Sequence, residues 1–204
     1  MNETGQQAII FAASHRAGGN SDHAAMLLAE GVAQAGGSAR IVALRKYHVL
    51  PCLACHACAK DEQSRCVLRD RDQAEELFSL VLEAPLVLFA SPIYFYALPS
   101  RLKTWIDRGQ RFWEARRKGE AWSLALPERK AHATLVAGQP SGQKLFEGAR
   151  LTLKYFLINF GHTLEAPLEL RAQDALGDLN NDHAAAQSVL AQGRAAWLSR
   201  QGMD

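Results

Sequence analysis

A regular alternation of short apolar runs with helical stripes restricts the fold of this chain more than any other feature. Five apolar runs fit buried strands, and between them the apolar residues recur every three or four positions. The expected strands are 8–13, 40–44, 86–91, 131–137 and 163–170, and the expected helices are about 20–35, 74–84, 99–117, 143–160 and 182–200. Such alternation predicts a parallel sheet with helices on both faces.

Five strands joined by right-handed crossovers fit the order 2-1-3-4-5, a flavodoxin-like three-layer α/β sandwich. A six-stranded dinucleotide-binding fold would need another strand and a G-x-G-x-x-G turn after the first strand, and the sequence has no such motif there. With 204 residues, we expect one domain over 1–204, with a cysteine-rich insertion at about 51–70.

The charge balance and the apolar stretches exclude several classes of protein. Lysine and arginine number 23 against 21 aspartates and glutamates, a net charge of +2, so we expect no nucleic-acid partner. The most apolar stretch, 81–98, is interrupted by Glu83, Pro85 and Pro92, so we expect no membrane span. The N-terminus has no basic region and only a short apolar run, so we expect no signal peptide and a cytoplasmic location.

The loop after the first expected strand, 14–21, has the composition of a phosphate site. It offers two hydroxyls, a guanidinium, a side-chain amide and two adjacent glycines just before a helix. The free N–H groups and partial positive charge of a helix N-terminus bind phosphate. An ordinary capped loop is the alternative, but the full charge of Arg16 favours a phosphate ligand.

The loop after the third expected strand, 92–98, reads PIYFYAL and is unusually aromatic. In a doubly wound sheet it lies beside the loop at 14–21, at the carboxyl ends of the strands where ligands bind. A planar, largely apolar ligand would account for the rings. Alternatively, they cover the edge of the sheet or form a contact between subunits.

All four cysteines lie within fifteen residues, at positions 52, 55, 58 and 66. Clustered cysteines in a reducing compartment indicate metal or redox chemistry. Three thiolates at three-residue spacing and a fourth from a short loop suit a [4Fe–4S] cluster. Zinc bound by four cysteines and four thiols without metal remain open alternatives.

These segments together resemble the NADPH-dependent FMN reductase family of flavodoxin-like proteins over about residues 8–165. The loop at 14–21 (S-x-R-x-x-G-N-S) is similar to the family's phosphate loop. The segments 91–94 (S-P-I-Y) and 102–108 (L-K-x-x-x-D-R) resemble its second signature. The cysteine pattern resembles the iron–sulfur flavoprotein branch of the family.

The resemblance implies FMN as cofactor and NAD(P)H as co-substrate. The residues that it assigns to FMN are Ser14, Arg16, Gly19, Asn20 and Ser21 at the phosphate, Pro92, Ile93, Tyr94 and Phe95 along the ring, and Gly138 beneath the far end of the ring. The residues that it assigns to a [4Fe–4S] cluster are Cys52, Cys55, Cys58 and Cys66. No catalytic side chain is expected, because the flavin carries the chemistry.

The prediction is therefore an FMN-dependent NAD(P)H oxidoreductase that passes hydride to bound FMN and on to a small-molecule or protein acceptor. The alternative is an iron–sulfur flavoprotein that exchanges electrons with a ferredoxin-like partner. The resemblance, together with Trp105, Phe112, Trp113 and the aromatic loop at 94–96, predicts a homodimer or homotetramer. The basic stretch 101–118 is expected to be a solvated helix face.

Overall fold

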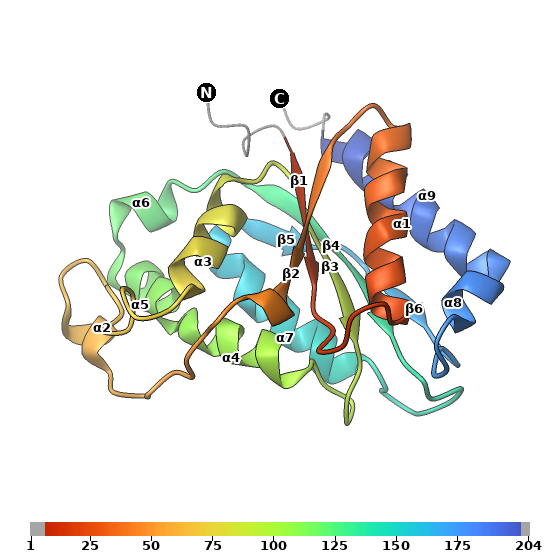
Figure 1. Ribbon diagram of the computed structural model, residues 1–204. Coiled ribbons are helices and arrows are strands. Elements are labelled where there is room, and N and C mark those ends of the chain that lie inside the picture. The colour runs from red at the N-terminus through yellow and green to blue at the C-terminus, as the bar shows by residue number, and fades with distance from the viewer. Residues whose placement is uncertain (1–6, 201–204) are drawn as a thin grey trace.

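The computed structural model of the chain describes residues 7–200, which form a parallel sheet covered by helices on both faces (Figure 1). The strands are β1 (Ala8–Ala12), β2 (Ala39–Ala43), β3 (Val87–Pro92), β4 (Arg129–Val136), β5 (His162–Leu164) and β6 (Leu168–Leu170). Their order is β2-β1-β3-β4-β5, with β6 also paired to β4, and each of these pairs is parallel. The predicted flavodoxin-like fold and strand order are confirmed.

The last part of the sheet differs from the single strand expected over 163–170. β5 pairs with the start of β4 and β6 with its end, so two short strands extend the same edge. Pro167 lies between them and has no backbone N–H to donate to the sheet. This missing donor accounts for the break.

The helices follow the expected stripes, with several shorter helices between them. They are α1 (Asn20–Gln34), η2 (Leu44–Lys46), α2 (Ala57–Lys60), α3 (Ala74–Glu83), α4 (Ser100–Arg108), α5 (Gln110–Lys118), α6 (Ala121–Leu124), α7 (Glu147–Leu157), η3 (Ile158–Phe160), α8 (Asp178–Asn181) and α9 (His183–Ser199). None of the helices within residues 7–200 has the length and apolarity needed to cross a membrane.

Two helices begin or end elsewhere than the periodicity predicts. The helix expected from 99 breaks into α4 and α5 at Gly109, where a Cβ would lie 2.8 Å from the Ile106 carbonyl oxygen and 3.1 Å from the Phe156 ring. Residues 143–146 are a turn, so α7 begins four residues later than expected, at Glu147. Close packing of α7 against this break explains why no side chain is present at 109.

One face of the sheet is covered by α3, α4, α5 and α7, which enclose an aromatic core (Figure 1). Phe78 lies at its centre, with ring centroids 5.4 Å from Trp105 and 4.8 Å from Phe112. Trp105 and Phe112 are fully buried here, so the expectation that they form part of a subunit interface is wrong. Trp113 is exposed, and the homodimer or homotetramer stays a prediction.

The other face is covered by α1 and α9, which cross with their backbones in contact (Figure 1). A Cβ on Gly31 would lie 2.2 Å from the Leu190 carbonyl oxygen, and one on Gly193 would lie 2.3 Å from the Leu28 carbonyl oxygen. Real side chains do not approach backbone that closely, so both positions require glycine for this crossing.

Buried His162, at the start of β5, makes the stability of the fold depend on pH. Burial, and secondarily the nearby charge of Arg129, lower the pKa of His162 from 6.5 to about 4. Its Nε2 lies 3.1 Å from the Val81 carbonyl oxygen, in the core between sheet and helix. The folded chain therefore keeps this imidazole neutral at pH values where the unfolded chain protonates it.

We expect the free energy of unfolding to fall as the pH drops from 6.5 towards 4, because only the unfolded chain takes up the proton of His162 in that window. At about 1.4 kcal/mol per pKa unit, the loss at the low end is about 3 kcal/mol. Denaturant unfolding of wild type and His162→Gln across this window tests the prediction. Equal pH dependence in the two proteins would contradict it.

Candidate cofactor site and cysteine pocket

The strands β1, β3 and β4 end at the same edge of the sheet (Figure 1). A cavity of ≈ 630 Å³ is lined by the residues that follow these ends. The parallel alignment of these strands brings the three following loops to the same edge. The ten residues predicted to bind FMN all line this cavity: Ser14, Arg16, Gly19, Asn20, Ser21, Pro92, Ile93, Tyr94, Phe95 and Gly138. The structure brings them together, and their individual contacts with FMN stay a prediction.

One end of the cavity is formed by the N-terminus of α1. Gly19 is the N-cap in extended conformation, and a Cβ there would lie 3.2 Å from Nε of Arg16. The guanidinium therefore lies against the start of the helix. Ser14 Oγ donates a hydrogen bond of 2.8 Å to the Arg16 carbonyl oxygen, which fixes the loop. Positive charge and unpaired helix N–H groups thus meet at one end, as a phosphate requires.

The side chain of Asn20 has a structural task in addition to its place on the cavity. Its Nδ2 donates to the carbonyl oxygens of Gln173, at 3.0 Å, and Ala175, at 2.8 Å. Its Oδ1 accepts from the Leu179 N–H at 3.3 Å. Both amide hydrogens are engaged, so the side chain fastens the 173–179 segment to α1. The donor that Asn20 offers a ligand is its backbone N–H, not the side-chain amide that the sequence suggested.

Gln173 and Asp174 are among the cavity residues that the sequence did not predict, because they lie in a segment between the last expected strand and the last expected helix that carries no motif. A Cβ on Gly138 would lie 2.5 Å from Oδ1 of Asp174. The carboxylate therefore packs directly on the Gly138 backbone, which explains the glycine there. No sequence motif identifies either residue. They reach the cavity because β6, which precedes them, pairs with β4.

The aromatic wall of the cavity ends in a tight turn at Tyr94–Ala97. The N–H of Tyr94 donates to the carbonyl of Ala97 at 3.0 Å, and the reverse bond has the same length. Phe95 and Tyr96 have φ of 49° and 63°, the left-handed pair of a type I′ turn that normally favours glycine or asparagine. Such backbone costs roughly 1–3 kcal/mol per residue and is found mainly at functional sites. The turn leaves the Phe95 ring fully exposed at the rim of the cavity.

A second cavity, of ≈ 440 Å³, is lined by all four cysteines together with residues of α4 and α5. Cys52 and Cys55 are exposed, and Cys58 and Cys66 are partly buried. Within residues 7–200, no three His, Cys, Asp or Glu side chains are grouped closely enough to hold a metal ion. The structure thus arranges the four thiols around one space without gathering them into a coordination site.

The cysteine segment has an unusual backbone. Ala54, His56 and Ser64 have φ of 49°, 56° and 51°, in the left-handed region that residues with a side chain rarely adopt. These conformations persist only where surrounding contacts enforce them. The segment is therefore held in one specific shape.

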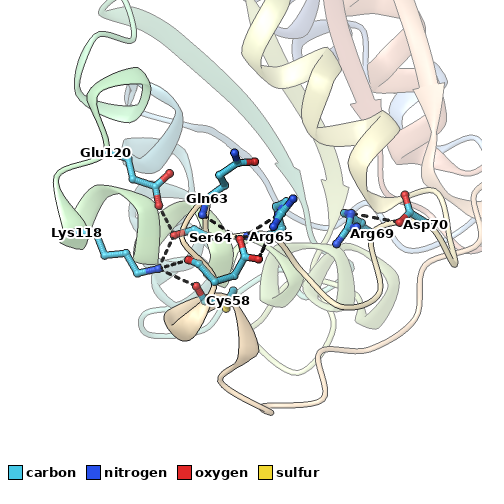
Figure 2. A network of polar contacts seen from close by, with 9 residues as sticks. Cys58, Gln63, Ser64, Arg65, Arg69, Asp70, Lys118 and Glu120 are labelled. Carbon is cyan, nitrogen blue, oxygen red and sulfur yellow. Dashed lines mark hydrogen bonds and ion pairs between the residues drawn. The ribbon is translucent and has the colours of Figure 1, made fainter.

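Lys118, at the end of α5, supplies many of these contacts (Figure 2). Its Nζ donates to the carbonyl oxygens of Cys58 and Asp61, at 3.1 and 2.6 Å, and to Oγ of Ser64, at 3.2 Å. Ser64 Oγ in turn donates to Glu120. One ammonium group thus satisfies carbonyls in and after α2 and ties the segment to α5.

A buried ion pair fixes the start of the cysteine segment. Arg108 Nη1 donates to the Asp72 carboxylate and to the Leu50 carbonyl oxygen, the latter at 3.1 Å. Asp72 also accepts from the N–H groups of Leu50, at 2.7 Å, and Ala74, at 3.1 Å. Burial alone would raise the pKa of Asp72, but these hydrogen bonds outweigh it and lower that pKa.

The Arg108 side chain is only 1% exposed, so the expectation of a solvated helix face over 101–118 is wrong at this residue. It lines the cysteine cavity, as does Arg111, which pairs with Glu75. Both arginines therefore belong to the wall of that cavity and to the contacts between α3 and the helices α4 and α5.

Comparison with known proteins connects the cavity to a family. Residues 7–152 match the sequence model of a family described as NADPH-dependent FMN reductase. No curated protein sequence matches significantly. A solved flavone reductase superposes with a TM-score of 0.67 at 14% identity. The alignment covers 96% of this chain and 63% of the flavone reductase chain.

Two other solved structures are covered almost completely. The NAD(P)H:quinone oxidoreductase from Methanothermobacter marburgensis superposes with a TM-score of 0.66 at 16% identity, covering 93% of this chain and 98% of its own. An azoreductase from Bacillus anthracis str. Sterne superposes with a TM-score of 0.61 at 15% identity. The alignment covers 97% of this chain and 99% of the azoreductase chain. At such identities these likenesses show the shared fold alone.

Proposed function

Because the chain belongs to the NADPH-dependent FMN reductase family, we propose that it binds FMN in the cavity at the carboxyl edge and passes hydride from NAD(P)H to a planar aromatic acceptor. The observation that carries the proposal is the cavity itself, with a positively charged helix N-terminus at one end and an aromatic turn at the other. When bound, FMN supplies the acceptance and return of hydride, and the protein supplies binding and orientation.

The cavity fits FMN in size and in the distribution of its polar groups. Its ≈ 630 Å³ lies within the range of small-molecule sites, roughly 300–1,000 Å³. We assign the phosphate to Arg16 and the first N–H groups of α1, since these donors occupy one end. The ring is assigned to the apolar wall at Pro92 and Ile93, and Gly138 lines the same cavity.

The acceptor class is proposed from the rim of the cavity. Phe95 is fully exposed, and Tyr94 and Tyr96 beside it are roughly half-exposed. Three rings at the mouth of a site favour stacking with a flat aromatic molecule over contact with a small inorganic ion. Similar structures named for flavone, quinone and azo compounds support the same class.

A second candidate function is electron exchange with a ferredoxin-like partner through a [4Fe–4S] cluster held by Cys52, Cys55, Cys58 and Cys66. All four cysteines line one cavity, and the strained, pinned backbone between them supports a specific occupant. When bound, the cluster supplies one-electron transfer. Within the described residues the two cavities share no lining residue, so each cofactor is expected to load independently.

Steady-state kinetics of the anaerobically purified, FMN-loaded protein distinguish the two candidates. Continuous oxidation of NADH or NADPH with a soluble quinone is expected if the first is right. Rapid reduction by ferredoxin with little NAD(P)H oxidation would favour the second. Neither activity, despite bound FMN, would contradict both.

Arg16→Ala removes a charge-assisted contact worth roughly 1.5–3 kcal/mol. We therefore expect FMN to bind about 10- to 150-fold more weakly, as measured by fluorescence titration. The fold should survive, because Arg16 is exposed. Arg40→Ala is the matched control, since Arg40 is an exposed arginine of β2 away from the cavity. Unchanged FMN affinity in Arg16→Ala would remove this residue from the site.

Anaerobic reconstitution with iron and sulfide should yield about four iron atoms per chain if the cysteines hold a cluster. Cys55→Ser is expected to lower the iron content while leaving FMN bound, because Cys55 is not part of the FMN cavity. Absence of iron uptake by wild type, or tight uptake of zinc in its place, would refute the cluster and leave the FMN assignment intact.

A further inference from the structure

We propose that the buried guanidinium of Arg108 donates hydrogen bonds to the sulfur atoms of the [4Fe–4S] cluster and raises its reduction potential. The proposal rests on the second candidate function, the binding of a cluster by the four cysteines. It concerns a residue of α4 that lies outside the cysteine segment and outside the FMN cavity.

Arg108 is buried, and in the described part of the chain only one of its three side-chain nitrogens makes a hydrogen bond of good geometry. Nη1 bonds to Asp72 and to the Leu50 carbonyl oxygen. Nε and Nη2 are buried and make no hydrogen bond of good geometry within residues 7–200. Burial lowers the pKa of Arg108, but Asp72 and the nearby Cys66 side chain raise it. Guanidinium has five N–H groups and cannot lose its charge in a protein, so burial without acceptors is unfavourable. The chain thus buries a cation whose remaining donors require an acceptor from elsewhere.

The position of Arg108 indicates which acceptor that is. Arg108 lines the cavity that all four cysteines line, together with apolar side chains such as Leu53 and Val67. Two carboxylates, Asp107 and Glu114, also line it, but they pair with Lys103 and Arg117. Thiolates and the sulfides of a cluster are anionic acceptors suited to such a space.

Arg111 provides an internal comparison on the same cavity wall. Its Nε and Nη2 both donate to the Glu75 carboxylate, so the corresponding nitrogen atoms already have partners. Of these two arginines, only Arg108 has buried nitrogens without a partner. The two residues have the same charge and line the same cavity, and they differ in whether donors are free.

Asp72 holds Arg108 in the orientation that the proposal requires. Its carboxylate is fixed by the N–H groups of Leu50 and Ala74, so the guanidinium is anchored from both the cysteine segment and α3. Hydrogen bonds to cluster sulfur stabilise the more negative, reduced state and therefore raise the potential. The backbone N–H of Leu68, which donates to Sγ of Cys66 at 3.5 Å, contributes in the same direction.

The test compares three variants of the full chain after anaerobic reconstitution. Arg108→Lys keeps a positive charge beside Asp72 but removes the Nε and Nη2 donors. The double variant Arg108→Met with Asp72→Asn removes both charges together, so no unpaired carboxylate is left buried. Arg111→Lys is the control. FMN binding reports folding, and iron content and an EPR-monitored redox titration report the cluster.

We expect both Arg108 variants to bind FMN as wild type does. At a fixed potential, the ratio of oxidised to reduced cluster should be about tenfold higher than in wild type. For a one-electron couple this is a decrease of about 59 mV. Loss of iron from both, with FMN bound and Arg111→Lys loaded, would overturn the proposal, because the lost contacts with Asp72 and Leu50 would then account for the effect without any bond to the cluster. Arg108 variants that load iron and titrate at the wild-type potential would overturn it. Iron-free wild type would instead refute the cluster itself.

Discussion

The parallel alignment of β1, β3 and β4 is the constraint on which the rest of the structure depends. Parallel strands end at the same edge of a sheet, so loops that are far apart in the sequence meet there. The cavity, the N-terminus of α1 and the aromatic turn at 94–97 are all consequences of this alignment. Helices on both faces bury β1 and β3, which explains why the sequences of these two strands are almost continuously apolar.

The strand order, and the grouping of the ten expected FMN residues around one cavity, could be predicted because they depend on local patterns: periodicity, and short motifs directly after a strand. Gln173 and Asp174 could not be, since they reach the cavity only through the pairing of β6 with β4 beyond Pro167. The engagement of the Asn20 amide was equally hidden, because its partner Gln173 lies 153 positions later. Contacts of that kind follow from tertiary packing.

The burial of Arg108 is a second feature that the sequence could not predict. A basic helix segment normally faces water, and nothing in its spacing indicates that one of its arginines is buried against Asp72, 36 positions earlier. A buried ion pair is weak support for stability, because desolvation offsets most of the attraction between the charges. Its effect here is on position: it joins α3, α4 and the backbone that leads into the cysteines.

The contact between α1 and α9 has a consequence for the cofactor site at the other end of α1. The helix α9 contributes no residue to the cavity, yet the backbones touch at Gly31 and Gly193, so α1 cannot slide or rotate without displacing α9. The helix α9 therefore fixes the position of the first N–H groups of α1, to which the phosphate is assigned in the proposed function. Sequence variation in α9 can change cofactor affinity while every cavity residue stays the same, and a comparison restricted to the cavity would not detect it.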